Sequence, residues 1–117
     1  MTIKPLTTIR TMADLKHTSE VLGGYFFSKD TIQFFKSRIL PHLYVTDATS
    51  GYFVTSEQSD NDPREYNVRS YAVIADRRES DNREFDRISI LTVGDSHKTR
   101  AQAQAYALKL KLDFLAL

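Results

Sequence analysis

The sequence contains no cysteine, only four glycines and three prolines, and no long apolar run. Without cysteine, a disulfide framework, a thiolate zinc site, an iron–sulfur cluster and a cysteine nucleophile are excluded. Neither a glycine-rich phosphate loop nor a Gly-x-Ser-x-Gly elbow is present. No segment approaches the roughly 18 apolar residues of a membrane span, and the N-terminus lacks the order of a signal peptide. We therefore expect a cytoplasmic protein that has no membrane partner.

What the sequence does contain is the composition of an ordinary folded domain. Its 117 residues are 41% hydrophobic and 26% charged, as in soluble globular proteins. A chain of this length can bury a core without a disulfide or a metal ion. No linker, repeat or low-complexity segment divides it. We expect a single α+β domain over residues 1–117, in which residues 1–10 form an extended arm.

Charge is nearly balanced in total but unevenly distributed. Sixteen basic and fifteen acidic residues give a net charge of +1, unlike a strongly basic nucleic-acid-binding domain. Residues 56–87 contain nine acidic and six basic side chains, so the remaining chain is the basic part. Such asymmetry can steer a partner, and it also occurs in the normal scatter of a solvated surface.

Two helices are predicted in the first third of the chain. Thr11 can cap a helix over residues 12–22. Ser28 can cap a second helix over residues 29–38, which Pro41 ends because the residue before a proline avoids helical dihedrals.

A third helix is predicted at the C-terminal end. Thr99 and Gln102 have the spacing of a capping box, in which each side chain accepts a backbone N–H of the other residue. Five apolar residues then recur at i, i+4, i+7, i+11 and i+14. This spacing predicts that one face packs on a sheet, formed by Ala101, Ala105, Leu108, Leu112 and Leu115.

The middle of the chain has the period and composition of β-strands. Four segments rich in aromatic and β-branched residues are predicted strands, namely 42–46, 51–56, 66–75 and 85–93. The apolar positions of the third strand change face partway, which indicates either a bulge near Arg69–Ser70 or a strand buried on both faces beyond that point. The expected fold is α+β, in the order α-α-β-β-β-β-α, with a single antiparallel sheet of about four strands and helices packed on one face.

No catalytic or metal-binding constellation is apparent in the sequence. His17, His42 and His97 have no partner at metal-ligand spacing, and such histidines are more often structural. Most carboxylates lie beside arginines, which keep the carboxyl pKa values low. A carboxyl group with a low pKa is a poor general acid. We expect a protein that is not an enzyme and has no metal ion or cofactor.

The charged connection 76–87 is the first candidate site, because loops on a rigid sheet often carry function. The alternative is a mobile, solvated hairpin tip. The candidate partner-binding residues are Asp76, Arg77, Arg78, Glu79, Asp81 and Arg83.

The start of the last helix is the second candidate site. A helix N-terminus with basic neighbours can bind phosphate, although ordinary flanking charge also explains the pattern. The candidate nucleic-acid-binding residues are His97, Lys98, Arg100 and Lys109. The arrangement is similar to the double-stranded-RNA-binding domain, in which basic residues here contact groove phosphates. Only Lys98 and Arg100 match that pattern, and His97 departs from the expected lysine.

One motif resembles a known group of proteins. The run Phe26-Phe27-Ser28-x-Asp30-Thr31-x-x-Phe34-Phe35-x-Ser37-Arg38-Ile39 resembles a family of short, uncharacterised proteins found in phage and plasmid genomes. The likeness continues weakly to about residue 108. It implies a mobile-element origin and a compact helix–sheet domain, and it brings no activity or catalytic residue.

These observations favour a small protein-binding module from a mobile element. Carboxylates on an exposed loop can occupy a site built for nucleic-acid phosphates. The expected partner is therefore a protein, such as a host nucleic-acid-processing or defence complex, which an anti-CRISPR-like inhibitor would block. The alternative is a nucleic-acid-binding accessory protein that uses the basic remainder of the chain.

Overall fold

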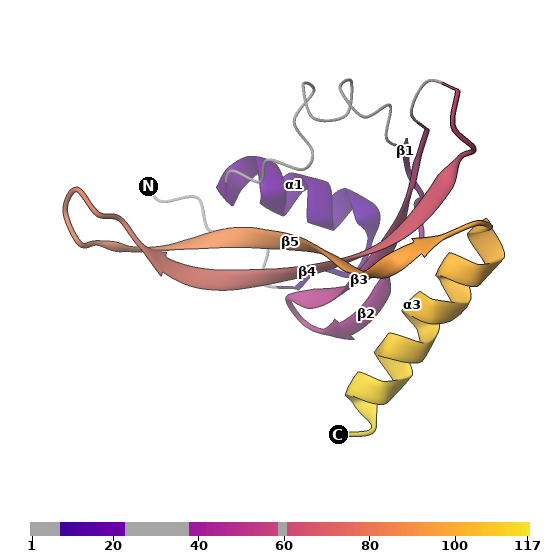
Figure 1. Ribbon diagram of the computed structural model, residues 1–117. Helices are drawn as coiled ribbons and strands as arrows, with labels where there is room; N and C mark the ends of the chain where they lie inside the picture. The colour runs from indigo at the N-terminus through magenta and orange to yellow at the C-terminus, as the bar shows by residue number, and fades with distance from the viewer. Residues whose placement is uncertain (1–7, 23–37, 59–60) are drawn as a thin grey trace.

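The computed structural model describes residues 8–22, 38–58 and 61–117. Within these ranges the chain forms two helices and one antiparallel sheet (Figure 1). The elements are α1 (Met12–Leu22), β1 (Arg38–Ile39), β2 (Tyr44–Asp47), β3 (Ser50–Glu57), β4 (Glu65–Arg77), β5 (Glu84–His97) and α3 (Arg100–Leu115). The α+β class is confirmed. One helix precedes the strands in the described ranges, and the helix expected over 29–38 lies outside them except for Arg38, which belongs to β1.

The sheet has the strand order β1-β3-β4-β5, and β2 also pairs with β3. β1 and β2 occupy successive parts of the same edge of β3, since Ile39 pairs with Thr55 and Tyr44 pairs with Tyr52. Pro41 lies between them. Because proline has no backbone N–H to donate to a ladder, it interrupts what would otherwise be one edge strand.

The pairing of β3 with β4 runs without a break from Ser50↔Ala72 to Glu57↔Glu65. The expected bulge near Arg69–Ser70 is therefore absent from this pairing. β4 instead has one buried residue on each face, Val68 on one and Tyr71 on the other, and the residues beyond Tyr71 are partly or fully exposed. The irregularity lies on β5, where His97 pairs with Tyr66. Gly94 has a φ of 69° at this point, a conformation that glycine adopts readily.

Two core clusters lie on opposite faces of the sheet, because neighbouring residues of a strand point to opposite sides. On the face of Phe53, α1 and the residues before it pack on the sheet through Ile9, Met12 and Leu15. On the face of Val54, α3 packs through Ala103 and Ala107 over Tyr44 and Val68. The two helices therefore cover opposite faces (Figure 1), and the prediction that both lie on one face is wrong. Both faces of β3 and β4 are apolar, so each requires its own cover.

The start of α1 is fixed by reciprocal hydrogen bonds. The Asp14 backbone N–H donates to Thr11 Oγ1 at 3.2 Å, and the Thr11 backbone N–H donates to Asp14 Oδ2 at 3.2 Å. Just before this cap, Ile9 is fully buried and its N–H donates to the Ala48 carbonyl at 2.6 Å. The helix predicted over 12–22 is confirmed, and the chain that leads into it is anchored in the core. Residues 1–7 of the N-terminal segment that we expect to be extended lie outside the described ranges.

The cap of α3 follows the sequence, whereas its buried face does not. Gln102 N–H donates to Thr99 Oγ1 at 3.1 Å, and Gln102 Oε1 accepts the N–H of Lys98 at 3.2 Å, one residue earlier than a capping box has it. Ala103 and Ala107 are fully buried against the sheet. The predicted packing face points outward and is exposed along its length, through Ala101, Ala105, Leu108, Leu112 and Leu115.

Candidate functional site

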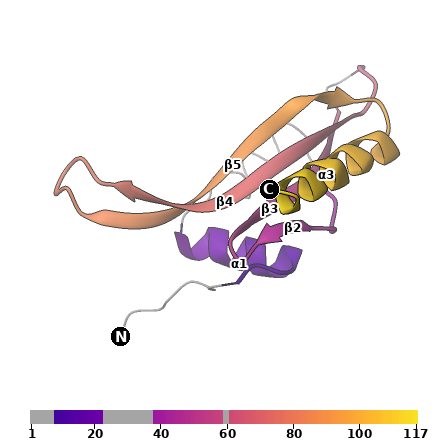
Figure 2. The same cartoon turned by 90° about the horizontal axis from the view of Figure 1, so that it is seen from below.

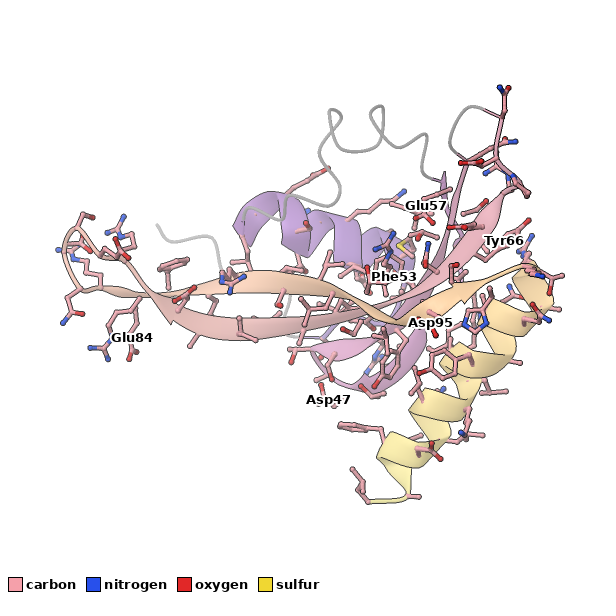
Figure 3. All side chains as sticks on the ribbon, in the orientation of Figure 1. Asp47, Phe53, Glu57, Tyr66, Glu84 and Asp95 are labelled. Atoms are coloured by element: carbon pink, nitrogen blue, oxygen red, sulfur yellow. The ribbon has the colours of Figure 1, made fainter. Side chains whose placement is uncertain are left out.

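The β4–β5 hairpin extends well beyond the rest of the sheet. Pairing of β4 with β3 ends at Ala72, whereas pairing of β4 with β5 continues to Arg77↔Glu84. The residues from Val73 to Ile88 thus form a two-stranded arm. Its root packs in the core beside α1 through Val73 and Ile88, and its far end projects beyond both helices (Figures 1 and 2). Figure 3 shows Glu84 on this arm, at the opposite end of the molecule from Tyr66. We refer to residues 73–88 as the arm.

The tip of the arm is shorter than the loop that the sequence suggested. The strands continue to Arg77 and resume at Glu84, so that only residues 78–83 form the turn. The Arg78 N–H donates to the Arg83 carbonyl at 3.0 Å, and the Asn82 N–H donates to the Arg78 carbonyl at 2.8 Å. Asn82 has a φ of 59°, a conformation that asparagine tolerates better than most residues. The tip is therefore a hydrogen-bonded turn.

Two ion pairs across the strands and one within the turn lie along the arm. Arg87 Nε lies 2.7 Å from Asp76 Oδ2, Arg77 Nη2 lies 2.9 Å from Glu84 Oε1, and Arg78 Nη2 lies 2.6 Å from Asp81 Oδ2. The backbone N–H of Arg77, and after it the Arg87 guanidinium, lower the pKa of Asp76. Exposed pairs of this kind contribute only about 0–1 kcal/mol each. They place acidic and basic side chains next to one another along the arm.

The arm brings together all of the predicted partner-binding residues. Two of them, Asp76 and Arg77, are on β4, and the other four lie in the tip. Glu79 forms no ion pair within the described part of the chain. Whether the arm binds a partner remains a prediction, but its six candidate residues lie together at the far end of the arm.

A groove that the sequence did not predict lies between the root of the arm and the C-terminal half of α3. Its volume is about 390 Å³. Ile74 and Leu91 of the hairpin and Phe114 of α3 contribute its apolar lining, and the hydroxyls of Thr46 and Ser50, 2.8 Å apart, contribute polar groups. The sequence signal for this groove is weak, since these residues come from five separate elements.

A second unpredicted feature is a polar cluster on the face of the sheet that α1 packs on. Glu57 Oε1 lies 2.7 Å from Arg69 Nη2, and Glu57 Oε2 accepts from Asn67 Nδ2 at 2.6 Å. The Glu57 and Arg69 side chains are only 15% and 18% exposed. Burial raises the pKa of Glu57, but hydrogen bonds from Thr55, Arg69 and Asn67 outweigh burial and lower it. A carboxylate held ionised in this way is a structural ion-pair partner and a poor proton donor.

The four candidate nucleic-acid-binding residues are not gathered at one place. The His97 ring packs on Tyr106 with 5.3 Å between ring centroids, and its Nε2 is buried. Lys98 and Arg100 are exposed at the start of α3. Lys109 lies about 13 Å beyond Arg100 along the helix axis, on the opposite side of the helix.

The described residues provide no metal-binding group of three or more histidine, aspartate or glutamate side chains. In the same part of the chain, neither helix has the length and apolar character needed to cross a membrane.

Comparison with known proteins places the chain in a family. Residues 11–108 match the model of a family of unknown function (DUF7447). No curated protein and no solved structure shows significant similarity. The matched residues run from the N-cap of α1 through the whole sheet to the middle of α3, so they include the arm. This chain therefore belongs to the DUF7447 family of unknown function.

Proposed function

We propose that this chain is a small, non-catalytic protein-binding module and that the arm is the surface that contacts its partner. The observation that carries the proposal is the projection of the arm beyond the sheet and both helices (Figure 1). A two-stranded ribbon adds little stability without a third strand. The projection is therefore not explained by stability. Its residues 76–87 contain nine charged side chains, four of them in two cross-strand ion pairs. A charge-patterned projection of this kind suits recognition of another protein.

The proposed source is a phage or plasmid, and the proposed partner is a host defence complex that processes nucleic acid, such as a CRISPR effector. The likeness of residues 26–39 to short proteins of mobile elements supports the source. The five carboxylates of residues 76–87 support the partner, since they can contact basic groups that otherwise bind phosphates. Such a protein would act in the cytoplasm of the host cell as an anti-defence inhibitor.

A nucleic-acid-binding role has less support. It depends on Lys98 and Arg100 at the start of α3, together with Lys109 and Lys111 further along. These side chains are spread along and around the helix, and the net charge of the chain is only +1. Phosphate binding requires several cations that act together.

Reversal of charge on the arm tests the proposal. The variant Asp76→Lys/Glu79→Lys/Asp81→Lys should lose the partner that the parent protein retains from host lysate at several salt concentrations. The matched control is Glu20→Lys/Asp62→Lys/Asp95→Lys, which makes the same change in net charge at exposed positions outside the arm. Both variants should keep the parent thermal stability, because exposed charges each contribute within about 0.5 kcal/mol.

Three results would contradict the proposal. The first is that the parent protein retains no partner at any salt concentration. The second is equal retention by the parent and the arm variant. The third is salt-dependent binding of the parent to duplex or single-stranded nucleic acid that tightens in the arm variant, which would support the nucleic-acid-binding role.

A further inference from the structure

Helix α3 has two apolar faces, of which the sheet covers only one. Ala103 and Ala107 are fully buried against the sheet. On the opposite side, Leu108, Leu112 and Leu115 are 44%, 55% and 54% exposed. Two exposed alanines continue the same line toward the start of the helix. We refer to this surface as the outer stripe, formed by Ala101, Ala105, Leu108, Leu112 and Leu115.

The outer stripe has the spacing of a coiled-coil seam. Its residues follow one another at intervals of four, three, four and three, which is the alternation of d and a positions in a heptad repeat. Single exposed leucines are common on protein surfaces, but a continuous apolar line indicates an interaction site. The two alanines allow a second helix to approach α3 closely at one end, and the three leucines provide the knobs at the other end.

The residues beside the outer stripe decide which kind of helix fits it. The flanking e and g positions of this heptad register are Gln102, Lys109, Gln104 and Lys111, none of which is acidic. In an antiparallel pair of two copies in which Leu108 of each packs on Leu112 of the other, the twofold axis would place Lys109 beside Lys109 and Lys111 beside Lys111. Like charges in this position oppose association, whereas acidic residues on a partner helix would attract both lysines.

We propose that the outer stripe binds an amphipathic helix of another protein, whose apolar seam is flanked by acidic residues. The surface belongs to α3 alone and is separate from the arm, so the inference does not depend on the proposed function. A basic amphipathic helix can also bind an anionic membrane. In α3, however, the opposite face is already packed on the sheet, and only two lysines flank the stripe, so a helical partner is favoured.

A pair of synthetic helices tests the specificity directly. Both peptides contain about three heptads with leucine at a and d, and they differ only in having glutamate or lysine at e and g. Fluorescence anisotropy at low salt should show that the glutamate peptide binds about fivefold or more tightly than the lysine peptide. The difference should shrink as salt increases, because salt screens exposed charges.

Variants of the chain identify the surface that the peptide contacts. Leu112→Ser should weaken binding of the glutamate peptide about tenfold or more, since the variant removes a central apolar contact. Val21→Ser, a matched change at an exposed apolar residue of α1, should leave binding unchanged. Lys109→Glu/Lys111→Glu should reverse the preference and select the lysine peptide, whereas Lys16→Glu/Lys98→Glu should keep the parent preference. Circular dichroism confirms that each variant is folded.

Several results would overturn the inference. These are binding of neither peptide, equal binding of both at low salt, and a charge-swap variant that still prefers glutamate. A concentration-dependent dimer that Leu112→Ser dissociates would show that a second copy covers the stripe instead. Stripe-dependent binding of the parent protein to vesicles that contain phosphatidylserine would likewise replace the helical partner with a lipid surface.

Discussion

Tyr71 combines a buried hydroxyl with a closely packed ring. The residue is 1% exposed and packs on Phe53, and in the described part of the chain its hydroxyl has no hydrogen-bond partner. A Cβ at Gly51 would lie 2.6 Å from this hydroxyl, which explains why the strand has glycine there. Burial, and after it the Asp47 carboxylate, raises the pKa of Tyr71 to about 12. The ring therefore contributes to packing, whereas the hydroxyl carries a desolvation cost.

We predict that Tyr71→Phe leaves the free energy of unfolding at pH 7 unchanged or raises it by about 1 kcal/mol, since it removes an unpaired buried polar group. The parent protein should also lose stability as the pH rises from about 10 to about 12, because the unfolded tyrosine ionises before the folded one. The variant should lack this part of the alkaline loss. Urea unfolding at pH 7 and pH 11 measures both effects. A variant less stable than its parent by more than about 1 kcal/mol at pH 7 would contradict this account.

For the ion pair between Glu57 and Arg69, we predict a change in stability at acid pH. Because the folded protein lowers the pKa of Glu57, the pair contributes stability above the unfolded pKa of about 4.5, and this contribution is lost as the pH falls through the folded value. Glu57→Gln should reduce the free energy of unfolding by about 1–3 kcal/mol at pH 7. It should also flatten the dependence of stability on pH below about 4.5.

The exposed pair of Arg77 with Glu84 provides the control. Its side chains are 57% and 71% exposed, so Glu84→Gln should change the free energy of unfolding by less than about 1 kcal/mol. Chemical unfolding of both variants between pH 3 and pH 7 compares the two pairs. Equal losses at the two sites would show that burial of the Glu57 pair adds nothing.

At the scale of elements, α3 offers a test of which face is buried. Ala103→Leu or Ala107→Leu inserts three carbons where the helix meets the sheet, and we expect each to lower the free energy of unfolding by about 1–3 kcal/mol. Ala105→Leu adds the same atoms on the outer stripe and should be nearly neutral. Urea unfolding at neutral pH measures the difference. A loss in Ala105→Leu as large as the loss in Ala107→Leu would place the outer stripe against the sheet.

The sequence predicted where α3 begins but not how it is oriented. The cap depends on Thr99 and Gln102, which are close together in the chain, so local chemistry is sufficient to predict it. The buried face depends on how near the helix comes to the sheet. Ala103 and Ala107 allow a closer approach than the larger leucines of the outer stripe, and this advantage exists only in the folded protein. With apolar residues on both sides, periodicity cannot select between the two faces.

The arm shows a second limit on what local sequence patterns can predict. Its charged residues predicted a loop, because single charges are unfavourable in strands. In the folded protein Arg77 lies opposite Glu84, and such opposite charges on facing strands favour the sheet. The linear order of the elements likewise did not predict that the helices lie on opposite faces of the sheet. The faces of Phe53 and Val54 are both apolar, and each is covered by its own helix. The candidate partner-binding residues could be proposed from the sequence because they are contiguous in it, and their role stays a prediction. The groove and the cluster of Glu57 join distant segments, so no local pattern predicts them.

At the scale of the whole molecule, the two cores share β3 and β4 and should unfold together. Both clusters include side chains from these strands, Phe53 and Tyr71 on one face and Val54 and Val68 on the other. The far end of the arm, residues 76–85, contributes no residue to either cluster. The molecule measures 46 Å along its longest axis and 24 Å along its shortest. The molecule thus has a body with two cores and a projecting hairpin end that belongs to neither core.

Removal of the projection separates the two parts. Replacement of residues 76–85 by Asn-Gly would join Ala75 to Asp86, which already face each other in the ladder, through a turn that suits a two-residue hairpin. Because the removed side chains contribute to neither core, the free energy of unfolding should change by no more than about 1 kcal/mol. Binding of the protein partner should be lost, whereas binding of the glutamate peptide to the outer stripe of α3 should persist. Urea unfolding and the two binding assays measure these outcomes on one variant. If the shortened protein unfolds at a much lower urea concentration, the arm stabilises the fold, and if it still retains its partner, recognition lies elsewhere on the body.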